Sequence, residues 1–256
     1  MDNFQPLSYA CTRGTLHDGR PVGLTRTIDG IQTYFSKPPG EAMEDAILLF
    51  TDAIGITFEN NKLLADSFAA NGYFVVMPDL FRGDAVPLNR PRNWSQTAWF
   101  RNHLPSDVGP VVRAVLREMQ GSGCRRIAGV GYSIGNKYLS RFLRSGYLCA
   151  GFMAHPTWVE EEDILSIERP VSIAFAGGDG YVNRLQRQEI EMMLTEAKVP
   201  FQTTLFSDVP HGFAVRHIHD KKYNKFVKEQ AFLQAIQWLD FYIKGEGSAK
   251  GFSAWT

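Results

Sequence analysis

The sequence predicts an α/β fold: a single domain with a mostly parallel central sheet and helices on both of its faces. Apolar runs of strand length alternate with amphipathic segments of helix length along most of the chain. These runs are hydrophobic throughout, as the strands of a parallel sheet covered on both faces must be. No linker rich in Pro, Gly or Ser divides the 256 residues, so we expect one domain over 1–256.

The first elements predict an antiparallel edge followed by two parallel strands. Polar and apolar residues alternate in LTRTIDGIQTYF (24–35) on both sides of an Asp-Gly pair, which is typical of a hairpin turn. The runs AILLFTD (46–52) and YFVVMPD (73–79) predict buried strands. Between them, NNKLLADSFAANG (60–72) begins with capping residues and ends in glycine, as helices do.

The rest of the chain repeats this alternation of helix and strand. Helical spacing of apolar residues is found at 107–123, 134–146 and 183–198, and near the C-terminus at Phe232, Ile236, Leu239 and Ile243. Further strands are predicted at 125–133, 148–155, 171–179 and 201–206.

Ligands of such sheets bind beyond the carboxyl ends of the strands, so the loops that follow the strands should share one edge. The functional site is expected among the residues that begin those loops, which are Asp52, Asp79, Ser133, His155, Asp179 and His211.

The composition favours a small-molecule partner. Lys and Arg number 27, and Asp and Glu also number 27. A chain without net charge lacks the basic surface that nucleic acid or an anionic membrane attracts. The first residues do not follow the pattern of a secretory signal, and no apolar run is long enough to span a bilayer, so we expect a cytoplasmic protein. The sequence does not indicate an oligomeric state.

The cysteines predict neither a disulfide framework nor a metal site. Cys11, Cys124 and Cys149 are odd in number and widely spaced. We interpret them as ordinary thiols, Cys124 at a strand edge and Cys149 in the core.

The stretch GYSIG places Ser133 between Gly131 and Gly135, after an apolar strand and before an amphipathic helix. This is the context in which G-x-S-x-G forms a sharp turn that presents a nucleophilic serine. The start of the following helix would offer backbone N–H groups to a developing oxyanion. The alternative is that Ser133 only caps the helix.

A serine nucleophile needs a base and a group that orients the base. Asp179 ends one predicted strand in FAGGDGYV, and His211 follows another in DVPHGFAVR. The order Ser, Asp, His along the chain is that of the α/β-hydrolases. Taken alone, the aspartate is typical of a turn and the histidine of a structural residue.

The other histidines are weaker candidates. His155, in MAHPTW, is expected to line the pocket and is the reserve base, with a hydrogen-bonded loop residue as the alternative. His217 and His219 lie near His211, but they have no cysteine or acidic residue at ligand spacing. We therefore expect a solvated surface there, with no metal and no cofactor.

With TDAIGI, VVMPDLFRGD, GYSIGNKY, GGDGYV and PHGFAVR in place, the chain resembles the dienelactone hydrolase family, most closely its fungal branch. The resemblance covers nearly the whole chain and implies an α/β-hydrolase fold. Members that hydrolyse dienelactone typically carry cysteine where Ser133 stands. They carry glutamate where Asp52 stands, and Asp52 is either a helper at the site or a residue that orders its loop.

The resemblance also implies roles for residues around the nucleophile. The backbone N–H groups of Ala53 and Ile134 would form the oxyanion hole. Arg82 and Arg216 would hold a substrate carboxylate, unless they pair with acids such as Asp79 or Asp84.

The sequence thus predicts a cofactor-independent serine hydrolase that opens an ester, lactone or thioester of a small metabolite, acidic or polyketide-like. Two alternatives stay open: another tailoring reaction of secondary metabolism, such as acyl transfer, C–C cleavage or isomerisation, and a binding protein without turnover. The irregular stretch 83–105, rich in Pro, Trp and Arg, forms either a lid or a surface loop.

Overall fold

The computed structural model describes residues 19–88, 90, 94–144, 146–216 and 222–244. The strands are β1 (Leu24–Ile28), β2 (Ile31–Ser36), β3 (Asp45–Phe50), β4 (Phe74–Pro78), β5 (Arg126–Tyr132), β6 (Gly151–Ala154), β7 (Val171–Gly178) and β8 (Phe201–Pro210). The helices are α1 (Glu59–Ala70), α2 (Gln96–Arg101), α3 (Pro105–Gly121), α4 (Gly135–Phe142), α5 (Glu161–Leu165), α6 (Arg184–Glu196) and α7 (Lys222–Leu239), which continues into a π-helical turn (Asp240–Lys244).

The described strands form one sheet in the order β1-β2-β4-β3-β5-β6-β7-β8. From β4 to β8 all neighbouring strands are parallel, whereas β1 and β2 are added antiparallel at one edge. The predicted hairpin is confirmed: Asp29 and Gly30 both have positive φ, 47° and 76°, as a tight two-residue turn requires. The predicted α/β fold with a mostly parallel sheet is therefore correct.

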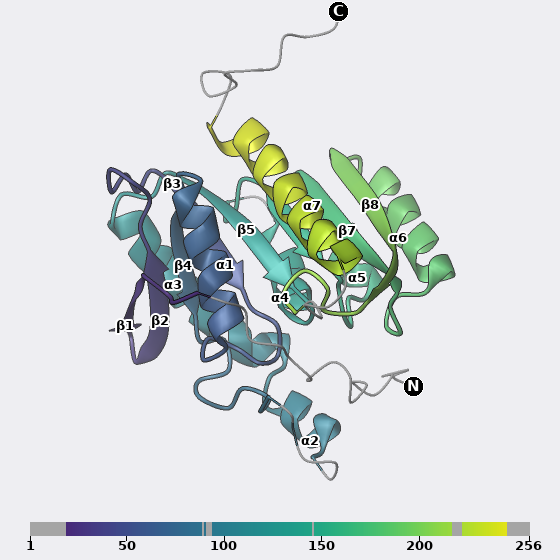
Figure 1. The fold of residues 1–256 in the computed structure, drawn as a ribbon, viewed down its shortest axis with the longest axis horizontal. Helices are drawn as coiled ribbons and strands as arrows, with labels where there is room; N and C mark the ends of the chain where they lie inside the picture. The colour runs from purple at the N-terminus through teal and green to yellow at the C-terminus, as the bar shows by residue number, and fades with distance from the viewer. Residues whose placement is uncertain (1–18, 89, 91–93, 145, 217–221, 245–256) are drawn as a thin grey trace, which may run out of the picture.

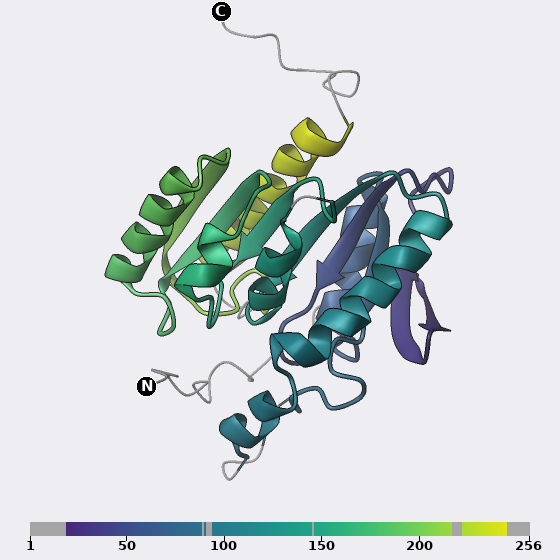
Figure 2. The same cartoon turned by 180° about the vertical axis from the view of Figure 1, so that it is seen from behind.

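Helices cover both faces of the sheet. In β3, Ala46, Leu48 and Phe50 face one core with apolar residues of α3, α4 and α6. Ile47 and Leu49 face the other core, with α1 and α7. Figure 1 shows α1 and α7 over one face, and Figure 2 shows α3 and α4 over the opposite face. Alternate residues of one strand are buried on opposite sides, which explains why these strands are apolar throughout.

The structure differs from the sequence prediction in local details. The short helices α2 and α5 were not expected, because a helix of five or six residues carries too few apolar positions for its period to be recognised. Cys124 is buried, but Cys149 is exposed, so the prediction of a core position was wrong for Cys149. Cys149 precedes β6 rather than lying within it. No described helix is both long and apolar enough to cross a membrane.

The turn from β5 to α4 depends on two glycines. Ser133 has a φ of 54°, in the left-handed region. A Cβ atom at Gly135 would lie 2.4 Å from the carbonyl oxygen of Phe50 in β3, and one at Gly131 would lie 2.4 Å from Oδ1 of Asn136. The close packing of α4 against β3 therefore requires the glycine at 135.

We expect Gly135→Ala to lower the free energy of unfolding by about 1–3 kcal/mol, because the methyl group would clash with backbone that cannot move without shifting β3. Urea denaturation measures this loss. The control is Gly121→Ala at the end of α3, where a Cβ would meet no heavy atom within 4 Å. That variant should keep its stability or gain up to about 1 kcal/mol. Equal losses in the two variants would contradict the argument.

Candidate active site

Ser133 occupies the turn between β5 and α4, at the carboxyl end of the central strand. Its backbone N–H donates to the carbonyl of Ala154 in β6, at 3.2 Å. Its carbonyl accepts from the side-chain amide of Asn136 at 3.0 Å and from the backbone N–H of Thr157 at 3.3 Å. The backbone N–H and C=O of Ser133 thus both have hydrogen-bond partners, which help to hold its strained backbone in place. The residue is only 3% exposed.

His211 and Asp179 meet Ser133 in a chain of hydrogen bonds. The Oγ atom of Ser133 lies 2.9 Å from Nε2 of His211, and Nδ1 of His211 lies 2.9 Å from Oδ2 of Asp179. A carboxylate only accepts, so Nδ1 carries the proton and Nε2 is left to accept the serine hydroxyl. Oδ1 of Asp179 accepts from the backbone N–H of Tyr181 at 2.8 Å, which fixes the carboxylate. The three side chains come from the ends of β5, β7 and β8.

Thr157 also reaches this chain, and sequence reasoning missed it. Its Oγ1 atom lies 3.3 Å from Oγ of Ser133 and 3.2 Å from Nε2 of His211. The only sequence signal was its place two residues after His155, at the end of a predicted strand. A threonine in a loop has no pattern of its own, so only the fold could bring it to the site.

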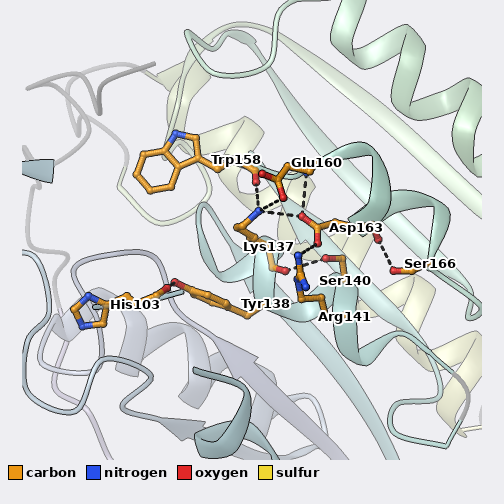
Figure 3. A network of polar contacts seen from close by, with 9 residues as sticks. All are labelled: His103, Lys137, Tyr138, Ser140, Arg141, Trp158, Glu160, Asp163 and Ser166. Atoms are coloured by element: carbon orange, nitrogen blue, oxygen red, sulfur yellow. Dashed lines mark hydrogen bonds and ion pairs between the residues drawn. The ribbon is translucent and has the colours of Figure 1, made fainter. Parts of the chain in front are cut away.

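An ionic cluster around the buried Lys137 and Asp163 connects α4 to the loop that carries Thr157 (Figure 3). Nζ of Lys137 donates to the carbonyl of Trp158 and to Glu160, both at 2.9 Å, and to Asp163 at 3.2 Å. Asp163 is also paired with Arg141 at 2.8 Å. Lys137 and Asp163 are 3% and 1% exposed, so each charge depends on its partners to offset the loss of water. No pattern in the sequence indicated a role for Lys137.

His155 is fully buried beside His211. The two rings are in edge contact, with centroids 4.8 Å apart, and Tyr132 and Phe213 pack around His155. Neither ring nitrogen of His155 has a hydrogen-bond partner among the described residues. Burial lowers the pKa of His155 well below its usual 6.5, and the nearby His211 and Arg216 add to this effect. His155 is therefore a neutral ring.

Asp52 and Arg216, for which the sequence predicted separate roles, form a buried ion pair with each other. Oδ1 of Asp52 accepts from the backbone N–H of Ile54 at 3.2 Å and from Asn61 at 3.1 Å. Its Oδ2 lies 3.7 Å from Nε of Arg216. Asp52 thus orders its own loop, which was one of the two roles considered for it, and it also faces Arg216.

The two arginines differ in their surroundings. Arg216 is 8% exposed and faces Asp52, so it pairs with an acid, as the alternative for it stated, although the acid is neither Asp79 nor Asp84. Asp79 instead accepts from the backbone N–H groups of Phe81 and Gly83. Arg82 is exposed, has a positive φ of 50°, and makes no ion pair with a described acid.

The two proposed oxyanion donors lie at the ends of neighbouring strands. Ala53 follows β3 and Ile134 follows β5, and these strands pair as far as Phe50 and Gly131. Ile134 immediately precedes the first residue of α4, where helix geometry leaves N–H groups without a partner inside the helix. Both residues are nearly buried, at 7% and 1% exposed.

Aromatic rings extend from the site toward α2. Tyr181 contacts His211 with ring centroids 4.7 Å apart, and Trp158 contacts Phe100 of α2 at 5.0 Å. The stretch 83–105 therefore contributes at least one residue against the loops of the site, although 89 and 91–93 lie outside the described residues. Figure 1 shows α2 apart from the sheet.

No group of three potential metal-binding side chains occurs among the described residues. His217, His219 and Cys11 lie outside the part of the chain that the structure describes.

Comparison with known proteins agrees with this architecture. Residues 31–243 match the dienelactone hydrolase family. Hydrolase pyvD of Aspergillus violaceofuscus is 44% identical over 240 residues, which cover 93% of this chain and 98% of that protein. Dienlactone hydrolase 1 of Gibberella moniliformis is 34% identical over 253 residues, which cover 94% and 96%.

A solved structure of a putative dienelactone hydrolase from Klebsiella pneumoniae has the same fold. It aligns with a TM-score of 0.73 over 86% of this chain and 99% of that chain, at 13% sequence identity. The family match covers residues 31–243, and the fungal relatives agree with it. The chain therefore belongs to the dienelactone hydrolase family, as its motifs implied.

Proposed function

We propose that this protein is a cofactor-independent serine hydrolase that opens an ester, lactone or thioester of a small metabolite through an acyl-enzyme on Ser133. The observation that carries the proposal is the hydrogen-bonded chain from Ser133 through His211 to Asp179. Membership of a family of hydrolases supports hydrolysis as the net reaction.

In the acylation step, Oγ of Ser133 attacks the substrate carbonyl carbon while its proton passes to Nε2 of His211. The electron pair of the carbonyl bond moves to the carbonyl oxygen. When the tetrahedral intermediate collapses, that pair returns, the bond to the leaving oxygen or sulfur breaks, and Nε2 gives the proton to the leaving group. Water repeats these steps on the acyl-enzyme and restores Ser133. Asp179 keeps the imidazole in the tautomer that these reaction steps need.

The N–H groups of Ala53 and Ile134 would receive the oxyanion. Both residues follow the neighbouring strands β3 and β5, at the edge of the sheet that carries Ser133, which supports this role. Donors fixed by the backbone need no rearrangement when the charge develops, which is why such groups lower the barrier.

Of the two arginines, Arg82 is the one whose exposure leaves it available to select an acidic substrate, whereas Arg216 is buried. Arg82 is exposed and without an acidic partner among the described residues, so it is available to a carboxylate. Arg216 already faces the buried Asp52. In this proposal Asp52, Arg216 and the neutral ring of His155 form the wall beside His211 and hold the pocket in shape.

Replacement of the nucleophile gives the first test. Ser133→Ala should lower kcat/KM for p-nitrophenyl acetate by about 10³-fold or more and abolish the acyl adduct seen by intact-mass spectrometry. The control is Ser140→Ala, which removes another buried serine from α4, one that bonds only the carbonyl of Lys137 in the structure. A Ser133→Ala variant that is still acylated at the native rate would contradict the assignment. A native protein that binds ligands but is never acylated would be a binding protein.

The pH dependence tests which histidine is the base. Protonated His211 cannot accept the serine proton, so kcat/KM should fall toward acidic pH. Because burial holds the pKa of His155 well below 6.5, His155 is neutral on both sides of this fall and cannot cause it. His155→Asn should therefore keep the acidic limb at the same pH, whatever its plateau rate, whereas His211→Gln should remove the limb together with most of the activity. A limb that moves only in His155→Asn would assign the base to His155.

Substrate charge tests Arg82. Arg82→Met should lower kcat/KM for an ester that carries a carboxylate about 10-fold more than for its uncharged analogue, because one charge-assisted hydrogen bond is lost. Arg117→Met is the control, since Arg117 is a 68% exposed arginine on α3 that faces Asp29. Its replacement should affect both substrates equally and slightly. Equal losses for both esters in Arg82→Met would show that Arg82 does not bind the substrate.

A further inference from the structure

The hydroxyl of Thr157 contacts both atoms that exchange the proton in the proposed reaction, so this inference rests on the proposed function. Thr157 is fully buried, and its Oγ1 lies 3.3 Å from Oγ of Ser133 and 3.2 Å from Nε2 of His211. A hydroxyl can donate one hydrogen bond and accept others. Its place between the nucleophile and the base therefore allows it to change its role as the proton moves.

In the resting site, the lone pair of Nε2 accepts the hydroxyl of Ser133 at 2.9 Å. Neutral Nε2 has a single lone pair in the plane of the ring, so it cannot fully accept a second donor at the same time. In this state the hydroxyl of Thr157 donates its hydrogen bond to Oγ of Ser133 instead. This contact holds the serine rotamer before substrate binds.

Proton transfer reverses the polarity of this contact. Once His211 carries the serine proton, Nε2 is a donor, and Oγ of Ser133 has become bonded to the substrate carbon. We propose that Thr157 is a catalytic residue whose hydroxyl oxygen accepts a hydrogen bond from Nε2–H of His211 in the tetrahedral intermediates. No covalent bond is made to Thr157. The proton stays on Nε2 until the leaving group takes it, and Thr157 then returns to its bond with Ser133.

The other described groups that face His211 do not offer an acceptor to Nε2–H. Asp179 is bonded to Nδ1, on the other side of the ring. His155 and Tyr181 contact the ring through edge-on aromatic packing, with centroids 4.8 and 4.7 Å away. Besides Ser133, Thr157 is the described residue with an oxygen within hydrogen-bond distance of Nε2.

The protein fixes Thr157 from both sides. Its backbone N–H donates to the carbonyl of Ser133, so the nucleophile itself anchors the residue. The neighbouring Trp158 has a φ of 54°, a strained conformation, and its carbonyl accepts from the buried Lys137 (Figure 3). Lys137 belongs to the helix that begins directly after the nucleophile. The position of the hydroxyl is therefore coupled to the turn that presents Ser133.

The test compares Thr157→Val, which has nearly the same shape but no hydroxyl, with Thr157→Ser, which keeps the hydroxyl. Two quantities are measured in each: kcat/KM for p-nitrophenyl acetate, and the dissociation constant of phenylboronic acid. The boronic acid imitates the intermediate, because Oγ of Ser133 donates an electron pair to boron and its proton passes to Nε2. Thr33→Val, which removes a buried hydroxyl bonded to the carbonyl of Ile31 in β2, is the control for the substitution itself.

We expect Thr157→Val to lower kcat/KM by about 10-fold or more and to raise the dissociation constant of phenylboronic acid by a similar factor, since a hydrogen bond to a charged group is lost. Thr157→Ser should restore both quantities to within about 3-fold of the native protein, and Thr33→Val should leave both unchanged.

Two results would overturn the inference for Thr157 alone. One is native activity and native boronate affinity in Thr157→Val. The other is a loss of activity and boronate affinity in Thr157→Val that Thr157→Ser shares, together with a lowered urea midpoint in both variants. Thr157 would then act only through packing. A native protein that forms neither an acyl adduct nor a boronate adduct on Ser133 would overturn the proposed function as well, so the two failures are distinguishable.

Discussion

The site depends on the close approach of the start of α4 to the backbone of β3. Only a residue without a Cβ fits at position 135, where the carbonyls of Phe50 and Thr51 would contact a methyl group. This packing fixes the direction in which α4 leaves the sheet and holds Ser133 at its positive φ. Asn136 then reaches back to the carbonyls of Ser133 and Ala154. A single steric constraint thus sets the position of Ser133 relative to the neighbouring strand.

Buried charges around Ser133 are matched by opposite charges, and each contact joins elements that are distant in sequence. Lys137 and Asp163 connect α4 to α5, and Arg216 and Asp52 connect the loops after β8 and β3. Charges removed from water are costly unless a partner and further hydrogen bonds offset the loss. Pairing therefore has a structural consequence, because it couples the loops of the site to one another.

The surroundings of Asp52 bear on the choice of nucleophile chemistry. Its carboxylate bonds Asn61 and the backbone of its own loop and faces Arg216, so its hydrogen-bonding capacity is directed away from Ser133. Among the described residues, His211 instead has a ring nitrogen within hydrogen-bond distance of the serine hydroxyl. These contacts support the proposed role of His211, rather than Asp52, as the base that serves Ser133.

The sequence by itself determined the order of the strands and of the longer helices, the parallel character of the sheet, the hairpin turn at Asp29-Gly30 and the candidate residues Ser133, Asp179 and His211. These follow from local rules: the hydrophobic period, turn chemistry and the motif around the nucleophile. Polar residues at strand ends could be predicted to share an edge because parallel strands end on one side. The motif and the order of residues predicted contacts among Ser133, His211 and Asp179, which the structure has, but the contacts of the other residues at strand ends could not be predicted.

Only the tertiary structure decided the roles that depend on contacts between distant segments. Thr157 and Lys137 carry no pattern of their own, and they reach the site because the loop after β6 folds over the start of α4. Arg216 and Arg82 occupy similar places in the sequence, yet one is buried against Asp52 and the other is exposed. The burial and pairing of a side chain depend on what the rest of the chain places around it, and local sequence does not contain that information.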